Sequence, residues 1–139
     1  RGSPPTTRAA RIAPEVEVAY QHARTIDAKI YKGIPLTQED WVQTQLMVGS
    51  PEWTVRTRGL SVLQGFRDGP HSSEAWQLAL DHLEDPTPVV RIYAIWAAAR
   101  LRPEDSVSHI TPLLQDPDKG VRQQAQETLV RLGHSIKHR

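Results

Sequence analysis

The sequence predicts an all-α fold, a short α-solenoid of stacked antiparallel helix pairs. The first observation is a motif that occurs three times, as SPEWTVRTRGLSVL from Ser50, DPTPVVRIYAIWAA from Asp85 and DPDKGVRQQAQETL from Asp116. Its copies are 35 and then 31 residues apart, a spacing typical of helical-repeat proteins. The second observation is that apolar residues recur at helical spacing, and no segment between Pro14 and Gly133 alternates as a strand does.

The domain organisation follows from this repeat. Residues 1–13, rich in Pro, Thr and Arg, are expected to form a flexible lead-in, and their first three residues resemble a cloning remnant. Residues 14–33 are predicted to form a capping helix, because Pro14 suits a first helical position and Gly33 suits a helix end. The remaining segments are three repeats at about 36–68, 72–102 and 103–133, followed by a tail at 134–139.

Each repeat is predicted to contain two helices, an A helix before the recurring proline and a B helix after it. The A helices are expected at about 37–48, 73–84 and 104–115. Thr37, Ser72 or Ser73, and Pro103 supply the start signals, since a hydroxyl side chain can cap free N–H groups and proline fits the first helical turn.

The B helix of the second repeat contains a predicted core stripe. Five apolar residues fall on one helical face, namely Val90, Ala94, Ala97, Ala98 and Leu101. Ile95 and Ala99 lie off this stripe. We expect them to face neighbouring repeats, because a middle repeat is flanked on both sides and needs apolar residues on both flanks.

The motif D-P-x-x-x-V-R-x-x-A, followed by a small residue or Leu and then Leu, resembles the HEAT-like repeats first grouped with phycobilisome lyases. The resemblance covers about residues 36–133 and is specific for the fold, not for a function. The first repeat departs from the pattern, since Ser50 replaces the aspartate and Gly59 the alanine. In solenoids of this kind the B helices line the concave face, so the resemblance implies the same here.

The recurring charged and proline residues are interpreted as structural. They are Arg56, Arg91, Arg122, Asp85, Pro86, Asp116 and Pro117. In similar repeats the arginine bonds turn carbonyls or the aspartate of an adjacent repeat, so Asp85 and Asp116 are the expected partners. Each aspartate also precedes a proline at a helix start, which predicts an N-cap. The alternative is a ladder of anion ligands.

One row of positions on the B helices differs between repeats. The second repeat has Ile92, Tyr93 and Trp96 where the first and third have polar residues. An aromatic pair flanked by arginine and polar side chains resembles the anchor and rim of a protein-binding surface. The candidate partner-binding residues are Arg58, Ser61, Ile92, Tyr93, Trp96, Gln124 and Glu127. Packing against neighbouring repeats, cover by the N-terminal segment and a homodimer contact are the alternatives.

The leading hypothesis is a non-catalytic protein-interaction or scaffolding domain that holds a peptide or protein on its concave face. The alternative is nucleic-acid binding through Arg58, Arg100 and Arg131, as in HEAT-like DNA glycosylases. A net charge of +1 and only four lysines argue against that alternative. Arg100 and Arg131 are otherwise interpreted as suiting the negative end of the helix dipole.

Catalytic chemistry finds no support in the sequence. The chain has no cysteine, no nucleophile elbow, no phosphate-binding glycine loop and no H-E-x-x-H, so we predict no catalytic residue, cofactor or metal site. An accessory lyase is suggested only by the family association. The longest apolar run, residues 92–99, is too short to span a bilayer. We therefore expect a soluble domain, which can be a piece of a larger anchored or secreted bacterial protein, and leave the compartment open.

Overall fold

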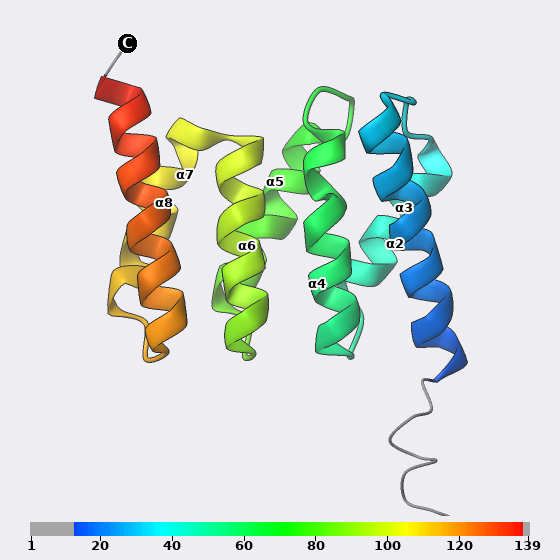
Figure 1. Ribbon diagram of the computed structural model, residues 1–139, viewed down its shortest axis with the longest axis horizontal. Helices are drawn as coiled ribbons and strands as arrows, with labels where there is room; N and C mark the ends of the chain where they lie inside the picture. The colour runs from blue at the N-terminus through cyan, green and yellow to red at the C-terminus, as the bar shows by residue number, and fades with distance from the viewer. Residues whose placement is uncertain (1–12, 138–139) are drawn as a thin grey trace, which may run out of the picture.

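The computed structural model describes residues 13–137, with side chains up to Gly133. Within this range the chain forms helices and no strand, so the predicted all-α fold is confirmed (Figure 1). The α-helices are α2 (Pro14–Lys32), α3 (Gln38–Val48), α4 (Trp53–Val62), α5 (Ser72–Asp81), α6 (Pro88–Leu101), α7 (Pro103–Ile110) and α8 (Lys119–Lys137). Short 3-10 helices follow three of them: η1 (Leu63–Phe66), η2 (His82–Glu84) and η3 (Thr111–Gln115). Residues 1–12 of the lead-in predicted at 1–13 lie outside the described residues, and Ala13 is the N-cap residue of α2.

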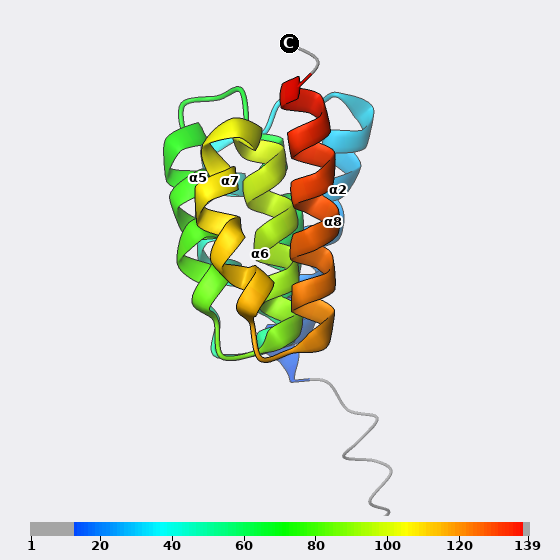
Figure 2. The same cartoon turned by 90° about the vertical axis from the view of Figure 1, so that its left-hand side faces the viewer.

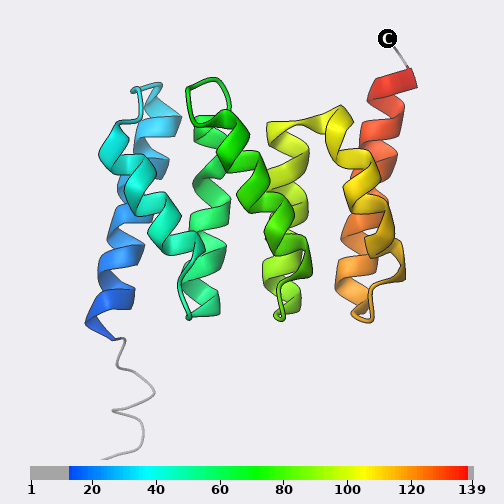
Figure 3. The same cartoon turned by 180° about the vertical axis from the view of Figure 1, so that it is seen from behind.

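The helices form two layers. Helices α2, α4, α6 and α8 lie side by side in one layer, and α3, α5 and α7 lie behind them (Figures 1 and 3). Figure 2 looks along the row from the α8 end and shows the two layers next to each other. Each A helix packs against the B helix that follows it, as α3 on α4, α5 on α6 and α7 on α8. The pairs therefore stack into a short helical solenoid.

The first two helices begin and end at the predicted signals. Pro14 is the first residue of α2, and Gly33 ends this helix with a φ of 72°, in the left-handed region that favours glycine. Thr37 caps α3 through a capping box. Its hydroxyl accepts a hydrogen bond from the Asp40 backbone N–H at 3.1 Å, and the Asp40 carboxylate accepts one from the Thr37 N–H at 2.8 Å.

Three helix ends differ from the prediction. The α-helical part of α5 stops at Asp81 and that of α7 at Ile110, and each continues as a 3-10 helix. In α7 the cause is Pro112, which has no N–H to donate and whose ring conflicts with the carbonyl four residues earlier. At the C-terminal end, α8 runs on to Lys137 and does not stop at Gly133.

The predicted N-caps at Asp85 and Asp116 are wrong. Thr87 stands at the N-cap position of α6, and the Asp85 carboxylate accepts a hydrogen bond from its backbone N–H at 2.9 Å. Asp118 caps α8, because its carboxylate accepts from the Val121 N–H at 3.0 Å. The Asp-Pro step puts each recurring aspartate too far ahead of the helix, so it braces the turn instead.

The predicted core stripe of α6 is buried. Val90, Ala94 and Ala98 are fully inaccessible, and Ala97 and Leu101 are 4% exposed. Ile95, expected to face a neighbouring repeat, is also fully buried. Helix α6 is apolar on two flanks because α4 and α8 pack on either side of it in the same layer (Figure 1). Among the described residues, no helix is both long enough and apolar enough to cross a membrane.

The capping helix α2 extends the B layer. It packs beside α4 (Figure 1). Its buried residues Val16, Ala23 and Ile26 form a small second core with Met47 and Val55. It therefore does not lie across the open face of α6. The alternative in which residues of this helix cover Tyr93 and Trp96 is wrong.

Candidate partner-binding site

A groove of about 500 Å³ lies between α6 and α8 on the B layer. Trp96, Ala99 and Arg100 of α6 line one side. Residues of α8 line the other, namely Gln124, Glu127, Thr128, Arg131 and Leu132. We call this the α6–α8 groove. It brings together three of the predicted partner-binding residues, Trp96, Gln124 and Glu127.

Trp96 is held in this groove by contacts on two sides. Its indole N–H donates a hydrogen bond to the Gln124 side-chain oxygen at 3.1 Å. Its ring meets the Tyr93 ring edge-to-face, with centroids 5.2 Å apart. Both aromatic residues are half-buried and pack on the main core. They thus form a positioned aromatic pair in which each residue is partly exposed, as a binding anchor requires.

The other predicted residues lie outside the α6–α8 groove. Arg58 lies over the Tyr20 ring of α2, with its guanidinium carbon 4.8 Å from the ring centroid. Ser61 donates its hydroxyl hydrogen bond back to the Arg58 carbonyl at 2.7 Å. Ile92 is half-buried against the core, and its side chain lies close to the first turn of α8 at Gly120. It therefore contributes to packing between repeats.

Two arginines give the groove its charge. Arg100 and Arg131 line it and are exposed, and neither forms an ion pair with another described residue. The Arg100 side chain makes a 3.4 Å hydrogen bond to Gln64. The sequence indicated that Arg100 and Arg131 lie near each other, because they occupy equivalent positions near the ends of two neighbouring B helices. Equivalent positions on neighbouring helices form a row across the array. Glu127 places one carboxylate on the groove.

Thr128 is a groove residue that is not among the predicted site residues. It is 2% exposed, and its hydroxyl is buried without a hydrogen-bond partner among the described residues. It aligns with Val62 and Ala97, which are buried and apolar. A hydroxyl in an otherwise apolar core row is the signal that marks this position, since buried polar groups are normally hydrogen-bonded.

The recurring arginines link adjacent repeats and do not line the α6–α8 groove. Arg56 donates to both carboxylate oxygens of Asp85 at 2.9 and 3.0 Å, and Arg91 donates to both of Asp116 at 2.9 Å. Each arginine also donates to turn carbonyls of its own repeat, for example from Arg91 to Asp85 at 2.7 Å. Arg122 donates only to the Asp116 and Pro117 carbonyls among the described residues. These residues hold the array together and leave the groove to others.

Burial and hydrogen bonding act in opposite directions on the pKa of Asp116. Burial raises this pKa by penalising the charged form. Hydrogen bonds from the Arg91 side chain and the Asp118 backbone lower it, as do the charges of Arg91 and Arg122, and together they outweigh burial. The pKa of Asp40 is also lowered, since the Lys29 hydrogen bond at 2.8 Å and the capping contact outweigh its burial. Both carboxylates are held in their charged form.

We expect the free energy of unfolding to fall on acidification. A carboxyl with a lowered folded pKa stabilises the fold fully above its unfolded pKa, about 3.9 for aspartate, and this contribution is lost as the pH falls through the folded pKa. Urea unfolding followed by circular dichroism, from neutral pH to about pH 2, measures the effect. Asp116→Asn should be less stable at neutral pH and lose less on acidification. The same pH dependence in both proteins would contradict the assignment.

Stacked antiparallel helix pairs joined by arginine–aspartate links define this chain as a helical-repeat protein. Residues 76–137 match the family model for HEAT repeats, which supports a HEAT-like repeat family. The match spans most of the second repeat and all of the third, and so includes both sides of the α6–α8 groove. HEAT repeats commonly mediate protein interactions. Searches of curated proteins and of solved structures each returned no match.

Proposed function

We propose that this chain is a non-catalytic protein-interaction domain that holds a peptide or protein partner in the α6–α8 groove. The observation that carries the proposal is a half-buried, positioned Trp96 in a groove that two arginines also line, neither of them with an ion-pair partner among the described residues. Tryptophan and arginine are the residues most often found at the energetic centre of protein interfaces. The repeat family supports the same function, because HEAT repeats commonly bind proteins.

The groove favours a particular ligand chemistry. The Trp96 ring, Ala99 and Leu132 provide apolar contact area, and Arg100 and Arg131 provide planar donors for a carboxylate. A peptide that carries a large apolar side chain next to Asp or Glu satisfies both. Glu127 at the same groove disfavours a ligand that is acidic throughout.

The test starts from a random-peptide library selected on the immobilised chain, followed by anisotropy titration of the labelled peptides that are recovered. We expect peptides with an apolar residue beside an acidic one. The double variant Arg100→Glu and Arg131→Glu should bind them at least about tenfold more weakly, since each charge-assisted hydrogen bond contributes about 1.5–3 kcal/mol. Both residues are exposed, so the fold should persist.

The matched control is Arg24→Glu with Lys32→Glu, which changes the net charge equally but on exposed residues of α2. This variant should bind the selected peptides as the unmodified chain does. Equal weakening by both double variants would mean that only the net charge matters. Unchanged binding by the groove variant would place the peptide elsewhere. Either result would remove the α6–α8 groove as the proposed site.

Nucleic-acid binding is the competing proposal for the same arginines. That proposal uses Arg58, Arg100 and Arg131, but Arg58 lies over Tyr20 and outside the α6–α8 groove. Anisotropy of a labelled mixed-sequence duplex at low salt decides between them, because phosphate contacts make binding salt-dependent. We expect no binding; a salt-sensitive complex lost on Arg100→Glu and Arg131→Glu would favour nucleic acid. The finer resemblance to phycobilisome-lyase repeats remains a prediction, and the chain is still predicted to be non-catalytic.

A further inference from the structure

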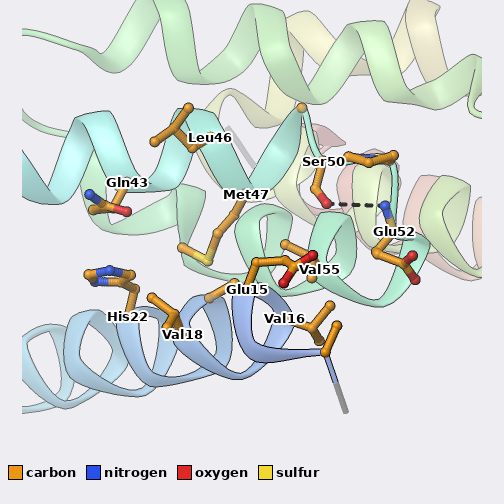
Figure 4. A pocket seen from close by; sticks show the side chains of 14 residues that line it. Glu15, Val16, Val18, His22, Gln43, Leu46, Met47, Ser50, Glu52 and Val55 are labelled. Atoms are coloured by element: carbon orange, nitrogen blue, oxygen red, sulfur yellow. Dashed lines mark hydrogen bonds between the residues drawn. The ribbon is translucent and has the colours of Figure 1, made fainter.

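A second groove, of about 520 Å³, lies at the N-terminal end of the array (Figure 4). It is bounded by the first half of α2, the second half of α3 and the turn into α4. We call it the α2–α3 groove. Val16 and Val18 line it from α2, Leu46 and Met47 from α3, and Val55 from α4. It is mainly apolar and shares no residue with the α6–α8 groove.

Exposed apolar side chains are concentrated at this end of the protein. Of eight large hydrophobic residues that are exposed among those described, six lie between Val18 and Trp53. Two of them line the α2–α3 groove, Val18 at 54% and Leu46 at 64% exposure. Exposed apolar side chains that cluster beside a groove indicate an interaction site. We therefore expect this end of the array to bind a ligand or a partner.

The repeating architecture indicates what that occupant is. Each of α4, α6 and α8 packs against an A helix that precedes it in the chain and runs antiparallel to it (Figures 1 and 3). Helix α2 lies in the same layer but has no such helix before it among the described residues (Figure 3). The α2–α3 groove lies on the A-helix side of α2, next to α3. It therefore continues the interface that the array builds repeatedly between A and B helices.

The charges around the groove point to a basic occupant. Glu15 and Glu52 line it near the N-terminus of α2, and both are exposed without an ion-pair partner among the described residues. Glu17 and Ser50 stand where the following repeats carry the linking arginine and aspartate, so no such link joins α2 to the first repeat. An A helix runs antiparallel to its B helix, so its C-terminal end would lie beside these carboxylates.

We propose that the α2–α3 groove binds one amphipathic helix of another protein, with an aliphatic face against Val18 and Leu46 and a Lys or Arg in its last turn against Glu15 and Glu52. The helix takes the place of the A helix that α2 lacks in the described array. Lysine or arginine in the last turn also suits the negative end of that helix's own dipole. Binding follows the helix-in-groove mode, in which apolar residues at helical spacing are the anchors.

The probe is a labelled 16-residue synthetic helix with Leu and Ala on one face, Gln on the other and two Lys in the last turn. Anisotropy titration against the full chain measures its dissociation constant. We expect binding that weakens at least about tenfold on Leu46→Glu, which puts a charge in the apolar groove. The matched control is Val130→Glu, because Val130 on α8 is as exposed as Leu46, 65% against 64%, and lies outside the groove.

Charge reversal tests the orientation of the helix. A second probe carries two Glu in place of the two Lys and should bind the unmodified chain more weakly. With Glu15→Lys and Glu52→Lys the preference should invert, so that the Glu probe binds better than the Lys probe. Equal affinity of the two probes, equal effects of Leu46→Glu and Val130→Glu, or no binding at millimolar probe would each overturn the proposal.

Two further measurements exclude other occupants. The chain has no cysteine, so Leu46→Cys introduces a single thiol whose reaction rate with a soluble reagent reports access to the groove. We expect a rate close to that of Val130→Cys; a much slower rate in the monomer would mean that the chain fills its own groove. We also expect a monomer in sedimentation at high concentration. Self-association that Leu46→Glu abolishes would assign the groove to a second copy and overturn the proposal.

Discussion

Replacing Arg91 by alanine should lower the free energy of unfolding by about 3–5 kcal/mol, the range for breaking a buried ion pair. The Asp116 side chain is 4% exposed and that of Arg91 12%, so the substitution leaves a buried carboxylate without its cation. It also removes the hydrogen bond from Arg91 to the Asp85 carbonyl. Urea unfolding at neutral pH, followed by circular dichroism, measures the loss.

Arg122→Ala is the matched control, because Arg122 occupies the same register in the last repeat. It donates to the Asp116 and Pro117 carbonyls at 2.8 and 3.1 Å but to no carboxylate among the described residues. Its loss removes two hydrogen bonds to carbonyls and should therefore cost about 1–2 kcal/mol, since an ordinary hydrogen bond contributes about 1 kcal/mol. If the two alanine variants lost the same stability, the link between repeats would contribute nothing beyond the turn.

Gly59→Ala should lower the free energy of unfolding by about 1–3 kcal/mol through overpacking. A methyl group at this position would come within 2.7 Å of the Val48 backbone nitrogen and 2.9 Å of the Met47 Cβ atom. Backbone atoms cannot turn aside, so α3 and α4 would have to separate. Helix propensity alone favours alanine over glycine by about 1 kcal/mol. Without the close contact, the same substitution would therefore raise the free energy of unfolding. Thermal unfolding of the variant measures the effect.

Gly133→Ala separates packing from propensity. Gly133 lies inside α8, and apart from the backbone of its own helix no described atom lies within 4 Å of where its methyl group would be. The propensity gain should then appear alone, as a stabilisation of up to about 1 kcal/mol. Stabilisation by both substitutions would show that α3 and α4 can separate at no cost, and that the close contact at Gly59 does not limit the structure.

The repeat accounts for how much of the fold could be predicted. A recurring valine, buried at Val55, Val90 and Val121, marks the inward face of each B helix. The spacing of the repeat together with this buried face predicts stacked helix pairs. The switch to 3-10 geometry in α7 could also have been read from Pro112. The role of the recurring aspartates as turn braces could not, because the spacing of Asp-Pro at a helix start also suits a cap.

The candidate site was predictable where it depended on register alone. Trp96, Gln124 and Glu127 occupy neighbouring rows of two B helices, and stacking brings such rows to one groove. Arg58 occupies the same row as Gln124 but lies over Tyr20, a residue of a helix without the motif. The position of the Arg58 side chain depends on where that helix packs, and the sequence repeat does not specify this.

The sequence by itself determined the helix pairs, their buried stripes and the order of the repeats, because these depend on residues a few positions apart or one repeat apart. Only the tertiary structure decided where α2 lies and which arginines reach the α6–α8 groove. It also decided that the α2–α3 groove is bounded by apolar residues on two helices. These features depend on contacts between side chains that are distant in sequence and follow no period, so packing geometry alone sets them.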